Sequence, residues 1–193
     1  AKLSTRKSMG YVRDVFQQRH MEKLIGNYGI GHVRYPTAGG NGKEFAQPMY
    51  VNSPYGISLA HNGNLTNAKQ LSNELFHAEM RHLQTDSDSE VLLNIFAHEL
   101  AKQREIYPDA KNIFKAVSKT HIRCDGAYAV IALITGHGLI AFRDNNGIRP
   151  LSIGIRKGKT RDEYVVASED ALFSSLGFSK LRDVDPGEAV FID

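Results

Sequence analysis

After two early strand-like stretches and a helical region, the apolar spacing of this 193-residue chain changes to that of strands near residue 127. Before that point Ala68, Leu71, Leu75 and Phe76 recur at the spacing of one face of a helix. After it, short apolar runs are separated by Gly-rich turns, which is the pattern of strands. Helices gathered in one part of a chain and strands in another predict an α+β fold with a mostly antiparallel sheet, because a parallel sheet would alternate the two.

The same patterns give the expected elements of this single domain. Strands are expected over 28–35, 56–63, 127–135, 138–143, 151–155, 163–168 and 188–192. Helices are expected after a cap at Thr66 or Asn67, over 87–100, and around Ile113, Phe114 and Val117. Ser87 with Glu90 three residues later predicts a capping box, and Ser168 is expected to cap a short helix that stops at Gly177.

Composition excludes several classes of protein. The chain is 41% hydrophobic and 23% charged, as is usual for a globular protein, and its net charge is only +3. Its basic residues form no long run, so we expect no nucleic-acid partner. The longest apolar run, 127–134, is too short to cross a bilayer, so we expect no membrane partner. A single cysteine excludes an internal disulfide and fits a reducing, cytoplasmic compartment.

The histidines and the cysteine give no sign of a metal site. Eight histidines are present, but no HxH or HExxH motif occurs, and His77 and His82 would diverge on a helix. Cys124 follows His121 by three residues, which leaves a catalytic pair open. A lone cysteine just before a buried strand is more typical of a small apolar core residue. We therefore expect no metal and a structural role for Cys124.

The stretch SLAHNGNL, residues 58–65, places Asn62 and Gly63 after an apolar approach. Asn-Gly is a strong hairpin signal, because type I′ turns need positive φ at both central residues. A polar hairpin turn explains the pair without any function. The Asn side-chain amide and the Gly backbone N–H are also two donors, however, which together suit the negative oxygen that develops in acyl transfer.

Two charged residues add a further possibility. Arg34 ends the expected strand 28–35, and Asp88 lies in the first turn of an expected helix. A surface ion pair would explain Arg34, and the helix dipole would explain Asp88. Together, a guanidinium fork and a carboxylate can hold the α-carboxylate and α-ammonium groups of an amino acid. The sequence offers no nucleophile with a base placed beside it.

Four motifs in this order identify a resemblance: GHVRYPT, AHNGNL, SDSEVLLN and FRDNNGIRPL. They resemble the glutaminase domain of the amidophosphoribosyltransferase family, and the similarity runs through essentially the whole chain. The first three motifs are shared by class II glutamine amidotransferases in general. The fourth, with HVRYPTAGG, favours this family over glucosamine-6-phosphate synthase, asparagine synthetase and glutamate synthase.

The resemblance implies a fold and a site. The fold is the N-terminal-nucleophile hydrolase sandwich, a four-layer αββα arrangement that this chain would contain only in part, without its first strands. Asn62 and Gly63 would form the oxyanion hole for the glutamine amide. Arg34 would hold the glutamine α-carboxylate, and Asp88 its α-ammonium group.

The resemblance also implies pocket residues and shows departures from the family. Tyr35 and Thr37 would line the pocket, whereas Asp86 offers a second carboxylate close to Asp88. The family's nucleophile is an amino-terminal cysteine whose own α-amino group serves as base, and it has no counterpart here. Residues 1–193 would therefore be a partial domain. The phosphoribosyltransferase domain that follows in the family, with its Mg²⁺, would be absent too, and no cofactor is expected in this domain.

The function implied by the resemblance is ammonia release from L-glutamine. The family transfers that ammonia to phosphoribosyl pyrophosphate to give 5-phosphoribosylamine, the first step of de novo purine biosynthesis. The implied partners are a phosphoribosyltransferase domain of the same polypeptide and further copies in a homo-oligomer. This chain alone is expected to be inactive. The alternatives are a catalytically silent glutamine-binding module, the glutaminase domain of another class II amidotransferase, and a structural fragment without a ligand.

Overall fold

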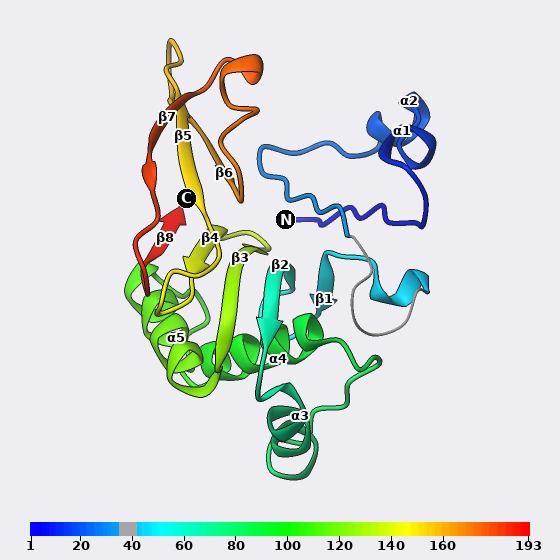
Figure 1. Cartoon of the computed structure of the whole chain (residues 1–193), viewed down its shortest axis with the longest axis vertical. Coiled ribbons are helices and arrows are strands. Elements are labelled where there is room, and N and C mark those ends of the chain that lie inside the picture. Colours follow the sequence, from blue (N-terminus) through cyan, green and yellow to red (C-terminus); the bar gives the residue numbers. More distant parts are fainter. Residues whose placement is uncertain (35–41) are drawn as a thin grey trace.

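The computed structural model describes residues 1–34 and 42–193, which form an α+β fold with two antiparallel sheets (Figure 1). Its elements, in chain order, are α1 (Val12–Val15), α2 (Gln18–Met21), the 3₁₀ helix η1 (Lys43–Phe45), β1 (Met49–Val51), β2 (Ile57–Leu65), α3 (Ala68–His77), α4 (Asp88–Ala101), α5 (Ala110–Arg123), β3 (Gly126–Ile134), β4 (Gly138–Arg143), β5 (Ser152–Arg156), β6 (Glu163–Ala167), the 3₁₀ helix η2 (Ser174–Leu176), β7 (Ser179–Asp183) and β8 (Ala189–Ile192).

The larger sheet has the strand order β1-β2-β3-β4-β8. β2 and β3 pair along their whole lengths, from Ile57 opposite Ile134 to Leu65 opposite Gly126. The helices α3, α4 and α5 lie together beside this sheet (Figure 1), and their apolar residues share one core with it. α4 is apolar on nearly all sides and almost wholly buried, because it lies between the sheet and its neighbouring helices.

The smaller sheet, β6-β5-β7, packs on the opposite face of β3 and β4. Side chains alternate across a strand, so β3 and β4 contribute to both cores. Val130 and Phe142 belong to the core shared with the helices, whereas Ala129 and Ala141 pack toward the second sheet. The fold is therefore helices, sheet and sheet, in that order, and its centre is β3 and β4.

Several expected elements differ from the structure. The strand expected over 28–35 is wrong over its described part, because residues 28–34 form no strand. The helix expected after Ser168 is reduced to turns and η2, although it does stop at Gly177, which has the left-handed conformation. The strands β1 and β7 were not predicted. β1 has only three residues, and β7 is an exposed strand without apolar alternation.

The three expected helices are confirmed, but the capping box is not. Ser87 caps α4 by accepting a hydrogen bond from Ser89 N at 3.3 Å. The carboxylate of Glu90 does not return to the cap residue. It accepts hydrogen bonds from the backbone N–H groups of Gln84 and Thr85, at 2.9 and 2.8 Å. Glu90 therefore joins the segment before α4 to the helix and helps to fix where α4 begins.

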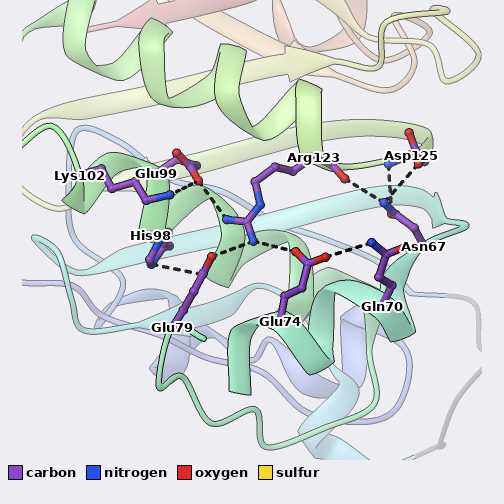
Figure 2. Close-up of polar contacts among 9 residues, drawn as sticks. All are labelled: Asn67, Gln70, Glu74, Glu79, His98, Glu99, Lys102, Arg123 and Asp125. Carbon is purple, nitrogen blue, oxygen red and sulfur yellow. Dashed lines mark hydrogen bonds and ion pairs between the residues drawn. The ribbon is translucent and has the colours of Figure 1, made fainter. Parts of the chain in front are cut away.

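The end of α5 is joined to the other helices by ion pairs of Arg123 (Figure 2). Its guanidinium lies 2.8 Å from Glu79, 2.9 Å from Glu99 and 3.4 Å from Glu74. We call these four residues the Arg123 cluster. Burial alone would raise the pKa of Glu99, but its hydrogen bonds from Lys102 and Arg123 outweigh burial and hold that pKa below its usual value. Glu99 therefore stays ionised inside the protein.

Next to this cluster, the beginning of α3 is bonded to the beginning of β3 (Figure 2). The Asn67 side chain donates to Arg123 O at 2.8 Å and accepts from Asp125 N at 3.1 Å. The backbone N–H of Thr66 donates to Asp125 O at 2.8 Å. These bonds fasten the end of β2 to the start of β3, and the end of β2 carries the predicted site residues Asn62 and Gly63.

Candidate functional site

Asn62 and Gly63 lie within β2, so the turn predicted at this pair is wrong. Asn62 is opposite Ala129 and Gly63 is opposite Tyr128 in the continuous pairing with β3. Gly63 has φ of +151°, and a Cβ atom there would lie 2.0 Å from Ala127 O. Glycine is needed at this position because the two strands approach closely, not because the chain reverses.

The side of β2 that faces β1 is only partly covered. β1 begins at Met49, opposite Leu59, and no described backbone segment continues the pairing beyond that point. The Gln47 side chain takes over instead. Its Oε1 accepts from His61 N at 2.7 Å, and its Nε2 donates to His61 O at 3.1 Å. A side-chain amide thus makes the two bonds that a neighbouring strand would make.

Further along the same side, the N–H of Leu65 donates to Asp88 Oδ2 at 3.0 Å. Alternate residues of a strand direct their N–H groups to the same side. The Gly63 N–H therefore points to the same side of β2 as the N–H groups of His61 and Leu65. No described residue accepts its hydrogen. We call this side of His61–Leu65 the β2 edge. Among the residues that the structure describes, its middle N–H is an open donor between two that are satisfied.

The Asn62 side chain lies on the sheet face that packs toward the second sheet, like its cross-strand neighbour Ala129. Its Nδ2 donates to Ser168 Oγ at 3.3 Å. An amide nitrogen carries two hydrogens, so the second remains available for another acceptor. The end of β2 therefore carries two donors, one from Asn62 and one from the Gly63 backbone.

Asp88 belongs to a small buried network at the start of α4. The Ser89 hydroxyl lies 3.0 Å from His61 Nδ1, 3.1 Å from Gln47 Nε2 and 3.5 Å from Asp88 Oδ1. Burial lowers the pKa of His61 to about 4, although the nearby Asp88 carboxylate opposes this shift. His61 is therefore neutral at pH 7 and acts as a hydrogen-bonding group.

We expect His61 to make the domain less stable in mild acid. An unfolded histidine binds a proton near pH 6.5, whereas folded His61 does so only near pH 4. Between these values the unfolded chain holds one more proton, so the free energy of unfolding falls as the pH falls, by about 3 kcal/mol in total. Urea unfolding measured from pH 7 to pH 4 should show a shallower dependence for His61→Gln.

The control for this experiment is His77→Gln, which changes an exposed histidine on α3. Part of the acid dependence should persist in His61→Gln, because burial also lowers the pKa values of His32, His98 and His121. Equal slopes for His61→Gln and the unsubstituted chain would contradict the assignment of a neutral, buried His61.

Arg34 lies near Gln47. Its guanidinium carbon is 5.5 Å from the centre of the Phe45 ring, and Arg34 and Gln47 line the same cavity of about 260 Å³. A neighbouring cavity of about 700 Å³, which Gln47 also lines, extends toward residues 1–6 and 133–138. Gln47 thus connects the surroundings of Arg34 with the network around Asp88.

Cys124 is confirmed as a core residue. It is 3% exposed, lies among the apolar residues between the helices and the large sheet, and has a pKa raised to about 12 by burial. A thiol with this pKa is protonated at neutral pH and is a poor nucleophile. Across the described residues, no three His, Cys, Asp or Glu side chains are grouped so that they could hold a metal ion. No helix there has both the length and the apolar character needed to cross a membrane.

The structure adds three residues that the sequence did not indicate: Gln47, Ser89 and Ser168. Ser89 had a weak signal, since it follows a predicted site residue in the first turn of a helix. The other two had none, because they reach the site from distant parts of the chain. Tyr35 and Thr37, which were predicted to line the pocket, lie outside the described residues.

Known proteins resemble this chain over nearly all of its length. The family described as glutamine amidotransferase domain matches residues 40–175. The amidophosphoribosyltransferase of Pseudomonas aeruginosa is 59% identical over 191 residues, which are 99% of this chain and 38% of that protein. That of Escherichia coli is 58% identical over 188 residues, 97% of this chain and 37% of the relative.

A solved structure resembles the fold. Glutamine phosphoribosylpyrophosphate amidotransferase from Bacillus subtilis, complexed with ADP and GMP, matches with a TM-score of 0.81 at 36% identity, over 100% of this chain and 38% of that one. The chain thus spans little more than a third of the length of these relatives. It belongs to the glutamine amidotransferase domain family, and its similarity is to the glutamine amidotransferase part of the amidophosphoribosyltransferases.

Proposed function

We propose that this chain is the glutaminase part of an amidophosphoribosyltransferase and binds L-glutamine at the β2 edge. Ammonia released from the glutamine amide would pass to phosphoribosyl pyrophosphate in a phosphoribosyltransferase domain of the same polypeptide, giving 5-phosphoribosylamine for purine biosynthesis. The observation that carries the proposal is the open N–H of Gly63, between the Asn62 amide and the Asp88 carboxylate at the end of β2.

The two charged side chains would hold the amino-acid part of glutamine. Asp88 uses Oδ2 for the Leu65 N–H, and its Oδ1 keeps acceptor capacity for an α-ammonium group. Arg34, at its cavity beside Gln47, would hold the α-carboxylate through a guanidinium fork. Tyr35 and Thr37 remain part of the proposal as residues that line the pocket.

The two donors would act on the reacting amide. Attack of a thiolate on the glutamine amide carbon moves negative charge onto the amide oxygen, where the Gly63 N–H and the free hydrogen of Asn62 Nδ2 would stabilise it. In the family the thiolate belongs to an amino-terminal cysteine, within a four-layer N-terminal-nucleophile hydrolase fold. We assign no metal to this chemistry and place the family's Mg²⁺ with the phosphoribosyltransferase domain. Assembly into homo-oligomers and a cytoplasmic location belong to the same proposal.

Glutamine binding measured by calorimetry tests the proposal on this chain. Asp88→Ala should weaken binding roughly 10- to 150-fold, since a hydrogen bond to a charged group contributes about 1.5–3 kcal/mol. The matched control is Asp86→Ala, which removes an exposed carboxylate two residues away. Unaltered glutamine affinity in Asp88→Ala would overturn the proposed clamp. If only Asp86→Ala weakened glutamine binding, the carboxylate that holds the α-ammonium group would be Asp86 and not Asp88.

A catalytically silent glutamine-binding module is the second candidate, and the buried Cys124 is a core residue in both candidates. Because that thiol has a pKa of about 12 and lies in the core, the 193-residue chain alone should release no ammonia from glutamine. Glutamate formation would be measured for the chain and for Cys124→Ala. Turnover that disappears in Cys124→Ala would contradict this expectation.

A chimaera separates the two candidates. In it, this chain replaces the matching 188 residues of the Escherichia coli relative, so that the remaining parts of that enzyme are present. A glutaminase domain should support synthesis of 5-phosphoribosylamine from glutamine. A chimaera that binds glutamine and uses supplied ammonia, but not glutamine, would favour the silent module.

A further inference from the structure

We propose that Ser168 is a positioning residue that orients the Asn62 amide toward the reacting oxygen. The inference rests on the proposed function and adds to it a residue that directly follows β6 of the second sheet. It starts from one contact, Asn62 Nδ2 to Ser168 Oγ at 3.3 Å, between residues 106 positions apart in the chain.

The geometry of an amide explains why this contact matters. The torsion that rotates an asparagine amide has broad preferences, so an unbonded amide samples many directions. The two hydrogens on Nδ2 lie in one plane at a fixed angle. When one of them is donated to Ser168, the direction of the other is set as well. In this structure the amide nitrogen lies on the Ser168 side, so its second hydrogen is the group that the bond directs.

Ser168 is itself held in place by the second sheet. β6 ends one residue before it, and the chain then turns back. Phe173 anchors this turn by packing against Gly154, where a Cβ atom would lie 2.8 Å from the Phe173 ring. Asp170 forms an ion pair with Lys180 at 2.8 Å across the same turn. Ser168 is therefore held between β6, which precedes it, and the anchored turn that follows it.

Other polar groups near Asn62 are already engaged. Asn62, Ala129 and Arg143 form a row on the face toward the second sheet. The Arg143 guanidinium donates to three backbone carbonyl groups, those of Arg149, Val184 and Gly147, at 2.5, 2.7 and 2.6 Å. In the described part of the chain, Ser168 is the side chain that hydrogen-bonds to the Asn62 amide.

Steady-state kinetics of the chimaera test the role. Ser168→Ala should lower the glutamine-dependent kcat about 3- to 10-fold, the effect of losing one neutral hydrogen bond. The glutamine KM should change little, because the oriented donor acts on charge that develops in the transition state. Ammonia-dependent synthesis should be unchanged. Ser168→Thr keeps a hydroxyl and should restore most of the rate.

The matched control is Ser175→Ala. Ser175 lies in the same turn, is exposed, and donates its hydroxyl to Leu172 O at 2.9 Å, so it should have no effect on either activity. Equal loss of the glutamine- and ammonia-dependent rates in Ser168→Ala would overturn the proposal, since it would show a merely structural serine. An unchanged kcat in Ser168→Ala would overturn it too.

A double-mutant cycle decides whether Ser168 acts through Asn62. In an Asn62→Ala background, adding Ser168→Ala should lower kcat no further, because the amide to be oriented is gone. Effects that multiply would overturn the positioning role. If Asn62→Ala alone leaves the glutamine-dependent kcat unchanged, the proposed oxyanion donor fails and Ser168 fails with it. If Asn62→Ala is strongly impaired but Ser168→Ala is not, only the present inference fails.

Discussion

Replacing Asn62 by alanine should lower the glutamine-dependent kcat of the chimaera by roughly two to three orders of magnitude, the usual effect of removing one oxyanion-hole donor. The amide oxygen carries full negative charge only in the tetrahedral intermediate, so the lost donor affects the rate more than it affects ground-state binding. The glutamine KM should therefore move far less than kcat.

Synthesis from supplied ammonia is the internal control for Asn62→Ala, because it bypasses the glutamine amide. That activity should persist, with an unchanged melting temperature. A thermally unstable Asn62→Ala protein that loses both activities equally would show that Asn62 serves only the packing between the two sheets.

Arg123→Leu should lower the free energy of unfolding by about 3–5 kcal/mol, as expected when one partner of a buried ion pair is removed. The variant would leave Glu79 and Glu99 without their common cation, and these side chains are only 10% and 6% exposed. Urea unfolding measures the loss. The matched control is Arg182→Leu, which breaks an exposed pair with Glu188 and should cost less than about 1 kcal/mol.

A second substitution tests the cause of the instability. If the Glu99 carboxylate, left with Lys102 as its cationic partner, is responsible, Arg123→Leu with Glu99→Gln should be more stable than Arg123→Leu alone. The folded pKa of Glu99 is depressed, so the stability it contributes is complete above the unfolded pKa and is lost as the pH falls through the folded pKa. A cost below about 1 kcal/mol for Arg123→Leu would place the Arg123 cluster among ordinary surface ion pairs.

Periodicity predicted the parts of the fold that follow local rules. The three long helices and most of the strands of both sheets were located because their apolar residues repeat with a helical or strand period. The helix faces were less accurate. Leu71 and Leu75 are buried, but Phe76 is 58% exposed and Phe114 is 39% exposed. A single apolar residue beside a helical stripe does not by itself show which way the helix faces.

The Asn-Gly pair failed as a turn for a physical reason. The same residue type serves a tight turn and a close approach between strands, and here Gly63 avoids the Ala127 carbonyl group. Local composition cannot distinguish the two. The strand instead continues through the pair to the buried Leu65.

The residues proposed for the site were predicted chiefly through the resemblance, and the structure shows where the described ones lie. Asn62, Gly63 and Asp88 do come together at the end of β2. Gln47 and Ser168 could not be found, because their contacts join residues 14 and 106 positions apart. A local sequence pattern predicts the secondary structure of its own segment. It does not predict which distant side chains will contact that segment.

The side-chain amide of Gln47 also determines what cannot attach at the β2 edge. An exposed strand edge usually invites another strand, because it offers donors and acceptors at regular intervals. Here the N–H groups of His61 and Leu65 are already used by Gln47 and Asp88, and one N–H remains between them. An extended peptide would find no ladder to continue. A single oxygen atom would find a donor, so the described part of this edge suits one small acceptor better than a neighbouring strand.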